Sequence, residues 1–271
     1  MNAVRPVKSL VLGSEGFVGK SFCTYLASTG EDVIRYDIRR DASEDARGGR
    51  LPLDVVDNVY FLAWEVGGAK YLYRDDVQFL QLDWNLQLLQ NVMPQLRAAK
   101  VPFLFVSSQL AEEYDTVYGV TKRMGEVWTH LLEGVRVRLW NVYGAYEAST
   151  ERSHVIADFV HQALDHGKIQ MMTTGEEMRQ FVYIDDVCHG FKRALDSGLT
   201  RVCDVSSFEW VSIRQVADVI ASITGADVIP GERVGRTPNT PMQGKIPGWL
   251  PEVSLEEGLR RTVDLYRAQS L

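Results

Sequence analysis

The sequence has few cysteines, no long apolar run and no excess of basic residues. Its 3 cysteines, Cys23, Cys188 and Cys203, are odd in number and show no C-x-x-C spacing. Neither a disulfide framework nor a structural zinc site is therefore expected. The sequence also lacks an H-E-x-x-H pair and an acidic calcium-type loop, so we expect no metal site.

Apolar runs and net charge exclude two further classes of protein. No run approaches the roughly 18 apolar residues of a membrane-spanning helix. The N-terminal apolar stretch, of about four residues, is too short for a signal peptide. With 36 Asp+Glu against 29 Lys+Arg the net charge is −7, whereas nucleic-acid binding favours a basic face. We therefore expect a cytoplasmic protein that binds neither membranes nor nucleic acids.

The first half of the 271 residues alternates between apolar strands and helices. Nearly continuous apolar runs followed by segments of helical spacing are typical of a parallel sheet covered on both faces. We expect strands at residues 8–13, 32–37, 58–64, 101–108 and 135–143. We expect helices at residues 17–29, 77–99 and 118–132. The pattern predicts an α/β fold with a doubly wound parallel sheet of the Rossmann type.

A glycine-rich turn follows the first expected strand. Gly13, Gly16 and Gly19 form G-x-x-G-x-x-G between a strand and a helix. Such a turn lets the backbone approach a pyrophosphate, and the helix N-terminus adds the positive end of its dipole. Asp37 ends the second strand about twenty residues on, where an acid binds the ribose hydroxyls of a dinucleotide. The motif predicts a dinucleotide site, and the alternative is a tight turn without a ligand.

Charges beside this turn bear on the choice of dinucleotide. The carboxylates of Asp37 and Glu15 repel a 2′-phosphate, which favours NAD as the cofactor. Arg39 and Arg40 follow directly and would attract that phosphate, so NADP stays possible.

The second half of the chain is less regular. We expect helices at 153–166, 186–196, 212–224 and 255–267, with short strands at 180–185 and 202–205. The proline-dense stretch 230–251 predicts a loop. We therefore divide the chain into a dinucleotide-binding Rossmann domain and a smaller, interleaved α/β part for the substrate. The first takes residues 1–145 with a returning segment near 180–205, and the second takes residues 146–179 and 206–271.

Tyr118 and Lys122 are four residues apart at the start of an expected helix, so they share one face. A lysine ammonium beside a phenol stabilises the phenolate and lowers a pKa that is otherwise about 10. The pair is therefore a candidate general base. Ser107 and Ser108 end the preceding strand, and either hydroxyl would orient a substrate oxygen, with Ser108 preferred. Capping of the next segment is the alternative role for these serines.

Taken together, the motifs make the chain resemble the extended short-chain dehydrogenase/reductase family, in particular its NAD-dependent nucleotide-sugar epimerases and dehydratases. The resemblance covers nearly the whole chain. It rests on Asp37 and on the segments GSEGFVG, LDV, FLAW, FVSS, YGVTK, RLWNVYG, RQFVYIDDV and GWLPEVSLEEGL.

The resemblance implies which residues contact the cofactor. In chain order they are Gly13, Gly16, Phe17, Val18, Asp37, Asp54, Val55, Leu62, Ala63, Trp64, Asn85 and Lys122. Among these, Asp54 and Val55 match the adenine contacts, and Lys122 also holds the nicotinamide ribose.

The resemblance also implies the catalytic and substrate residues. Tyr118 matches the base, and Asn141 a substrate-phosphate contact. Arg179 and Arg233 match arginines that grip a nucleotide diphosphate, although a solvated surface arginine is the alternative for each. His154 is expected at the surface, and an acid in the sugar pocket is its alternative role.

One segment departs from the family pattern. The stretch between Ser108 and Tyr118 is short, and Gln109 stands where the family's dehydratases begin an Asp-Glu pair. Glu112 and Glu113 come later and are expected to be solvated. We therefore predict an NAD-dependent nucleotide-sugar epimerase, or a ketosugar reductase, that acts by Tyr-Lys assisted hydride transfer at a sugar carbinol. A 4,6-dehydratase and a non-catalytic NAD(P)-binding sensor are the alternatives.

The helices at 77–99 and 118–132 carry many apolar residues. These include Trp84, Leu88, Leu89, Val92, Trp128, Leu131 and Leu132. Because the equivalent helices of related proteins form a four-helix dimer interface, the resemblance implies a homodimer. The alternative is that these side chains only cover the sheet.

Overall fold

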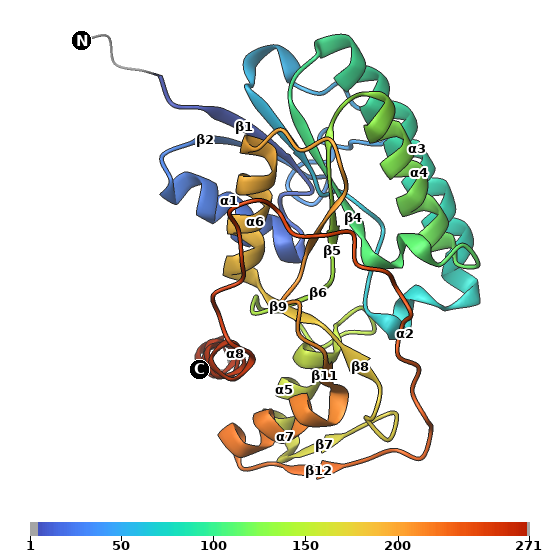
Figure 1. Cartoon of the computed structure of the whole chain (residues 1–271), viewed down its shortest axis with the longest axis vertical. Helices are drawn as coiled ribbons and strands as arrows, with labels where there is room; N and C mark the ends of the chain where they lie inside the picture. The colour runs from blue at the N-terminus through green and yellow to red at the C-terminus, as the bar shows by residue number, and fades with distance from the viewer. Residues whose placement is uncertain (1–4, 270–271) are drawn as a thin grey trace.

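The protein, described over residues 5–269 by a computed structural model, is built around a six-stranded sheet (Figure 1). Its strands are β1 (Lys8–Leu12), β2 (Asp32–Tyr36), β3 (Asn58–Phe61), β4 (Phe103–Ser108), β5 (Val135–Leu139) and β10 (Cys203–Val205). They lie in the order β10-β5-β4-β3-β1-β2, and every neighbouring pair is parallel. The strand order reverses beside β1, which confirms the predicted doubly wound α/β fold.

Helices cover both faces of the sheet (Figure 1). The four main ones are α1 (Phe17–Ser28), α3 (Asp75–Ala99), α4 (Val117–Leu131) and α6 (Ile184–Asp196). Alternate residues of β1 serve the two sides, because successive side chains of a strand point to opposite faces. Val11 belongs to the same core cluster as Phe22 of α1, whereas Leu10 and Leu12 belong to that of Leu88 on α3.

A smaller unit follows at the carboxyl ends of the sheet strands (Figure 1). Its elements are β6 (Asn141–Tyr143), α5 (Val155–His166), β7 (Lys168–Gln170), β8 (Met178–Arg179), β9 (Phe181–Tyr183), β11 (Val211–Ser212), α7 (Ile213–Thr224), β12 (Asp227–Ile229) and α8 (Leu255–Gln269). The strands form three separate pairs, β6 with β9, β8 with β11 and β7 with β12. Three short helices sit in loops of the sheet domain, η1 (Leu53–Val55), α2 (Ala69–Leu72) and η2 (Gln109–Glu112). The domain boundary at residue 145 stays a prediction.

Residues 135–143, expected as one strand, form two. Trp140 separates β5 from β6 and is buried, with its Nε1 donating to Oδ1 of Asp204 at 2.9 Å. Beyond Trp140 the chain leaves the six-stranded sheet, and β6 pairs with β9 instead. The apolar run is continuous across this point, so the sequence pattern gives no sign of the change of partner.

The proline-rich strap, residues 230–251, contains no helix or strand and runs from the smaller unit back along the sheet domain (Figure 1). Asp204, which is fully buried in β10, holds it there. Its Oδ2 accepts the backbone N–H groups of Gln243 at 2.5 Å and Gly244 at 2.8 Å. The strap therefore has a fixed course although it has no regular structure.

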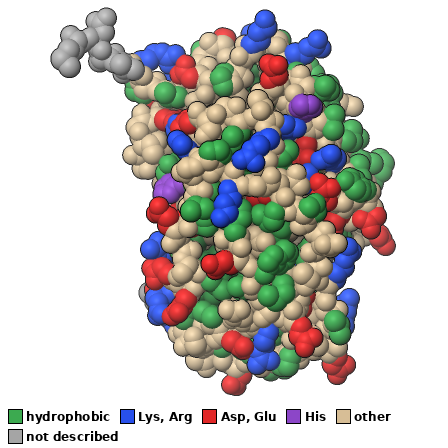
Figure 2. Space-filling view, in the orientation of Figure 1, with side chains coloured by type: hydrophobic (Ala, Val, Ile, Leu, Met, Phe, Trp, Pro, Cys, Tyr) green, Lys and Arg blue, Asp and Glu red, His purple; other side chains and the backbone are tan. Residues whose placement is uncertain are grey.

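The surface agrees with the overall charge of the chain. Acidic and basic side chains are interspersed over the face shown in Figure 2, without a field of one sign. Within residues 5–269, no helix is both long and apolar enough to cross a bilayer.

A buried ion-pair network joins the sheet to α4. Arg138 of β5 is 1% exposed and binds Glu126 of α4 through Nε–Oε1 at 2.7 Å and Nη2–Oε2 at 2.9 Å. Its Nη1 donates to Glu112 of η2 at 2.7 Å, and the Ser107 hydroxyl of β4 donates to Glu126 at 2.7 Å. Burial by itself raises the pKa of Glu126, but hydrogen bonds and charge from Arg138 outweigh it and hold that pKa below its ordinary value. The resulting stability is present at neutral pH and is lost as the pH falls through the folded-state pKa.

Replacing Arg138 by methionine leaves the Glu126 carboxylate buried without its main partner. We expect Arg138→Met to lower the free energy of unfolding by about 3–5 kcal/mol, as for other broken buried pairs. Urea unfolding at pH 7 measures the loss. The double variant Arg138→Met/Glu126→Leu removes both charges and is expected to recover most of it. A single variant as stable as the unmodified protein contradicts the assignment.

Candidate active site

A cavity of about 1050 Å³ lies between the carboxyl edge of the sheet and the smaller unit. Its wall contains the residues that follow β1, β2 and β3, the end of β4, the first turns of α4 and part of the proline-rich strap. Ligands of open α/β sheets bind at this edge, where the strand order reverses. The cavity is at the upper end of ligand pockets of about 300–1,000 Å³, so it has room for a cofactor together with a substrate.

The glycine-rich turn forms one end of the cavity. The backbone of Gly13 has φ +87°, and a Cβ there would come within 2.6 Å of the Ala63 nitrogen. A Cβ on Gly19 would collide with the carbonyl oxygen of Gly13. Helix α1 begins at Phe17, and among the described residues no side chain caps its N-terminus. Its first N–H groups, beside cavity residues Gly16, Phe17 and Val18, therefore suit the diphosphate of a dinucleotide.

Asp37 lies in the cavity wall at the end of β2. Its carboxylate accepts the backbone N–H groups of Glu15 and Arg39, each at 2.9 Å, and the Arg39 Nε at 3.2 Å. Burial raises the pKa of Asp37, but these hydrogen bonds outweigh it and hold the pKa below its ordinary value. The side chain is thus a fixed carboxylate, as a ribose hydroxyl requires. Arg40 turns to Glu44, at 2.5 Å, and is not among the residues that line the cavity.

Asp54 and Val55 do not line the cavity. They lie in η1, where both are exposed, and the cavity wall contains Asp45 and Ala46 instead. The loop between β2 and β3 folds so that Ala46 is buried near the cofactor end. Both dipeptides are an acid followed by an apolar residue, so the sequence alone does not show which of them lines the cavity. The adenine contact of Asp54 and Val55 stays a prediction.

The catalytic candidates meet at the other end. Tyr118, in the first turn of α4, and Ser108, at the end of β4, both line the cavity. Burial raises the pKa of Tyr118 to about 12, although the nearby Ser108 hydroxyl acts in the opposite direction. Ser107 also contributes to the wall, but its hydroxyl donates to Glu126 in the core. Ser108 caps η2, where its Oγ accepts the Leu110 N–H at 3.2 Å, and its side chain stays the preferred candidate for the substrate-orienting hydroxyl.

Lys122 lies one turn further along α4 and is 4% exposed. Its Nζ donates to the Val106 carbonyl at 2.7 Å and lies 4.1 Å from the centre of the Trp64 ring. Burial holds the pKa of Lys122 well below its ordinary value, against the opposing charge of Glu126. Burial thus acts against the positive charge that the predicted Tyr118–Lys122 pairing needs.

The end of β3 supplies further wall residues. Leu62, Ala63 and Trp64 line the cavity as expected. Asn85 does not; it lies fully buried on α3, where Oδ1 accepts the Glu65 N–H at 2.8 Å and Nδ2 donates to the Glu65 carbonyl at 3.2 Å. It therefore positions the loop after β3 rather than touching a ligand.

Two buried polar atoms of the wall have no hydrogen-bond partner within residues 5–269. They are Trp64 Nε1 and Gln109 Oε1. Because buried polar atoms are almost always paired, these two indicate where a bound ligand completes the site. Together with the glycine-rich turn and Asp37, they make the cavity fit a dinucleotide.

The smaller unit brings cations to the cavity. Arg179 of β8 and Asn141 of β6 line it as expected, and burial lowers the pKa of Arg179. Arg233 does not: it is exposed in the strap, where its carbonyl accepts the N–H of Thr174 at 2.8 Å. Arg236, three residues on, lines the cavity instead. In an irregular segment, periodicity cannot show which arginine turns inward.

Glu112, the last residue of η2, and Glu113, which follows it, have different surroundings, although both are expected to be solvated. Glu112 is bound to the buried Arg138, whereas Glu113 lines the cavity, and its Oε2 accepts the Tyr73 hydroxyl at 3.4 Å. The Glu113 carbonyl also accepts the N–H of Thr116 at 3.3 Å, which fixes this residue beside the start of α4. A carboxylate thus lies in the same wall as Tyr118.

Further charged wall residues carry no sequence motif. They include Glu44, Asp45, Arg47, Glu65, Asp115, Glu147, Arg152 and Arg236. His154, whose Nδ1 lies 2.7 Å from Glu147 Oε1, lines the cavity too. All come from loops, where neither spacing nor periodicity points to a site. No cluster of three or more metal-ligating side chains occurs in the described part of the chain.

Known proteins resemble the chain over almost its full length. UDP-glucuronic acid decarboxylase 1 of Xenopus tropicalis is 23% identical over 96% of this chain and 72% of its own. The structure of an epimerase from Methanothermobacter thermautotrophicus superposes with a TM-score of 0.81 at 22% identity, covering 99% of this chain and 94% of that one. UDP-glucuronic acid 4-epimerase of Bacillus cereus, solved with UDP-glucuronic acid and NAD, gives 0.79 at 22% identity, covering 97% and 100%.

The family assignment rests on a family-model match over more than half of the chain. Residues 9–202, which include the glycine-rich turn, Asp37 and the Tyr118–Lys122 pair, match the NAD dependent epimerase/dehydratase family. The predicted resemblance and the choice of NAD as cofactor are thereby confirmed. The chain belongs to the NAD dependent epimerase/dehydratase family.

Proposed function

We propose that the protein is a nucleotide-sugar epimerase or ketosugar reductase that acts at a sugar carbinol. The observation that carries this proposal is that Tyr118 and Ser108 lie together in the wall of a cavity that fits a dinucleotide. A non-catalytic sensor has no use for a phenol in this position. The cytoplasmic location stays a prediction.

The chain's own residues divide the work of such a reaction. Bound NAD supplies the hydride acceptor and donor. Tyr118 takes the proton of a sugar hydroxyl that Ser108 orients, and returns it in the reverse direction. Because the pKa of Tyr118 is about 12 here, further positive charge must come near the phenol in the complete site. Lys122, whose Nζ lies 5.9 Å from the centre of the Tyr118 ring, supplies part of that charge when it is protonated.

The cations of the smaller unit support a nucleotide diphosphate as the substrate's recognised part. Arg179 and Arg236 lie in the wall, and their charges reach the Tyr73 hydroxyl beside Glu113. Two arginines suit a diphosphate because each guanidinium donates in a fork. UDP-glucuronic acid bound to the Bacillus cereus epimerase is consistent with this class of substrate.

Replacing Tyr118 by phenylalanine removes the base and keeps the ring. With the nucleotide sugar chosen from a thermal-shift panel of UDP-, GDP-, dTDP- and CDP-sugars, we expect turnover to fall by about 10²–10⁴ while the Kd for NAD is unchanged. Lys122→Met is expected to lower both turnover and NAD affinity. Ser108→Ala is expected to cost more turnover than Ser107→Ala. A Tyr118→Phe enzyme with near-normal turnover contradicts the proposal.

The position of Glu113 supports a second candidate function, in which a proton is also removed from a carbon of the sugar. A transient carbonyl on the sugar acidifies the neighbouring C–H, and a carboxylate in the same wall as Tyr118 is a base for it. A dehydratase of the predicted alternative type needs such a group.

Solvent deuterium separates the two candidates. If Glu113 is a base, product formed in D2O carries deuterium on the carbon next to the oxidised carbinol. Glu113→Gln then lowers incorporation by about 10²-fold, whereas the hydride step persists. Glu133→Gln, which alters an exposed carboxylate just beyond α4 and outside the cavity wall, is the matched control. A product without deuterium excludes Glu113 as a base at carbon and supports the epimerase or reductase.

We also propose that the protein forms a homodimer through α4. Val120, Met124, Val127 and Leu131 lie on one face of this helix and are 37–71% exposed. Of the apolar residues named from the sequence, Leu88, Leu89 and Val92 instead cover the sheet and are buried. The apolar residues that cover the sheet are thus different from those that form the exposed stripe on α4.

Sedimentation at micromolar concentration tests the dimer. We expect the protein to sediment with twice the mass of one chain, and Val127→Glu to shift it to the monomer because a charge enters the apolar stripe. Val234→Glu, at an 80% exposed valine of the strap, is expected to leave the mass unchanged. A monomeric unmodified protein refutes this interface.

A further inference from the structure

A three-residue cluster, Glu65, Tyr71 and Arg152, lies in and beside the cavity wall. Arg152 Nη1 is 2.8 Å from Glu65 Oε1, and its Nη2 donates to the Tyr71 hydroxyl at 2.7 Å. The Tyr71 hydroxyl in turn donates to Glu65 Oε1 at 2.5 Å, and the guanidinium lies 4.0 Å from the centre of the Tyr71 ring. The catalytic steps proposed above use none of these groups.

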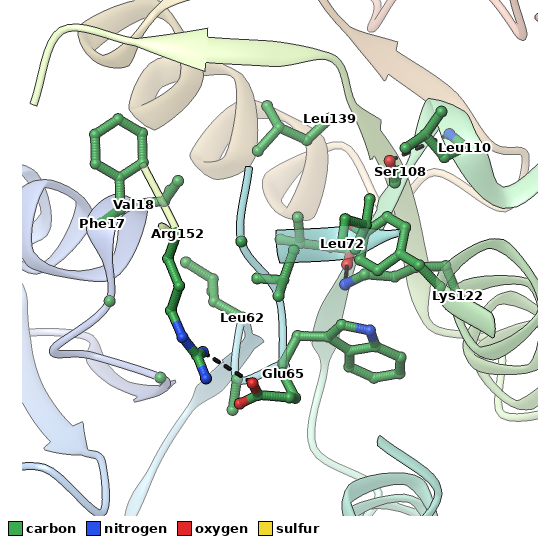
Figure 3. Close-up of a pocket in the computed structure, with 18 of the residues that line it drawn as sticks. Phe17, Val18, Leu62, Glu65, Leu72, Ser108, Leu110, Lys122, Leu139 and Arg152 are labelled. Atoms are coloured by element: carbon green, nitrogen blue, oxygen red, sulfur yellow. Dashed lines mark hydrogen bonds and ion pairs between the residues drawn. The ribbon is translucent and has the colours of Figure 1, made fainter. Parts of the chain in front are cut away.

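The cluster joins the smaller unit to the dinucleotide end of the cavity. Arg152 belongs to the segment before α5, and its extended side chain passes between Phe17 and Leu62 to reach Glu65 (Figure 3). Two residues further on, the His154 ring stacks on Phe17, the first residue of α1, at 5.7 Å. The Arg152 carbonyl accepts the Gly68 N–H at 2.7 Å. The segment that carries Arg152 is therefore held against the start of α1, whose N-terminus suits a diphosphate.

The other cations of the dinucleotide end have fixed partners. Arg39 is bound to Asp37, and Arg47 to Asp45 at 2.7 Å. The side chain of Arg152 is 45% exposed, whereas that of Glu65 is 10% exposed. Of this pair, the arginine is the partner that can reach an incoming anion.

Glu65 keeps its remaining partners if Arg152 turns away. The Tyr71 hydroxyl still donates to its carboxylate, and Asn85 still holds its backbone. When the Arg152 guanidinium moves from the Glu65 carboxylate to a diphosphate, no buried charge is left without a hydrogen bond. The free-energy cost of the move is therefore small.

We propose that Arg152 binds the diphosphate of the dinucleotide and that Glu65 holds its guanidinium until the cofactor arrives. The exchange ties cofactor binding to the position of the segment that precedes α5. This proposal rests on dinucleotide binding, which the family supplies, and not on the sugar chemistry proposed above.

Calorimetry with NAD and with ADP-ribose tests the exchange without any turnover. Arg152→Gln removes a charge-assisted contact, so we expect its Kd for both ligands to rise by about 10–100-fold. Glu65→Gln removes the competitor, and we expect its Kd to fall by about 3–10-fold. The double variant is expected to bind as weakly as Arg152→Gln. Arg214→Gln, which breaks the exposed Arg214–Asp218 pair of α7, is the matched control and leaves both Kd values unchanged.

Two outcomes overturn the proposal. If Glu65→Gln weakens NAD binding as much as Arg152→Gln does, the pair is a structural clamp, and thermal unfolding of both variants will show the shared loss. If Arg152→Gln weakens the binding of UDP and leaves that of ADP-ribose unchanged, the arginine serves the substrate's diphosphate. Arg152→Lys keeps the positive charge but lacks the forked guanidinium. If the fold needs a cation at this position, this variant still folds, and its Kd for NAD can be measured.

Discussion

The arrangement of the catalytic end depends on one buried ion pair, Arg138 with Glu126. A guanidinium on β5 and a carboxylate on α4 are costly to bury separately, so each fixes the other. Glu126 also receives the Ser107 hydroxyl, and Arg138 also holds Glu112 of η2. The strand end, the helix that carries Tyr118 and the segment between them are thereby fixed relative to one another, although they touch the ligand cavity from different directions.

The same network explains why adjacent carboxylates have different environments. Glu112 is drawn to Arg138 in the core, and the short segment to α4 then leaves Glu113 on the opposite side, facing the cavity. The short connection from η2 to α4 thus holds a carboxylate in the wall that also contains Tyr118.

Burial has opposite consequences for the two halves of the Tyr118–Lys122 pair. Neutral forms are favoured in both, because the phenol and the amine are each removed from water. Aromatic rings such as Trp64 surround the amine. At the dinucleotide end the balance differs, since N–H donors hold the pKa of Asp37 below its ordinary value. Burial thus acts against charge at the catalytic end, whereas hydrogen bonds favour it at the dinucleotide end.

The sequence by itself determined the fold class, the cofactor and the strand-end positions of the principal site residues. Apolar periodicity, the glycine-rich turn and the spacing of Tyr118 and Lys122 are local properties, and local geometry carries them into the structure. Strand alternation also gives the neighbouring Ser107 and Ser108 different surroundings. Asp37 directly ends a strand, so its place in the cavity wall follows from the sequence pattern, whereas the roles of these residues stay predictions.

Only the tertiary structure decided which loop residues reach the cavity. Asp45 rather than Asp54, Arg236 rather than Arg233, and Glu113 at all, come from segments without a repeating geometry, so their spacing in the chain says nothing about their direction. The pairing of Arg152 with Glu65 joins residues far apart in sequence, and it exists only because the smaller unit folds over the end of β3. In a helix or strand, the position of a residue in the sequence determines the direction of its side chain. In a loop, that direction depends on long-range contacts with the rest of the protein.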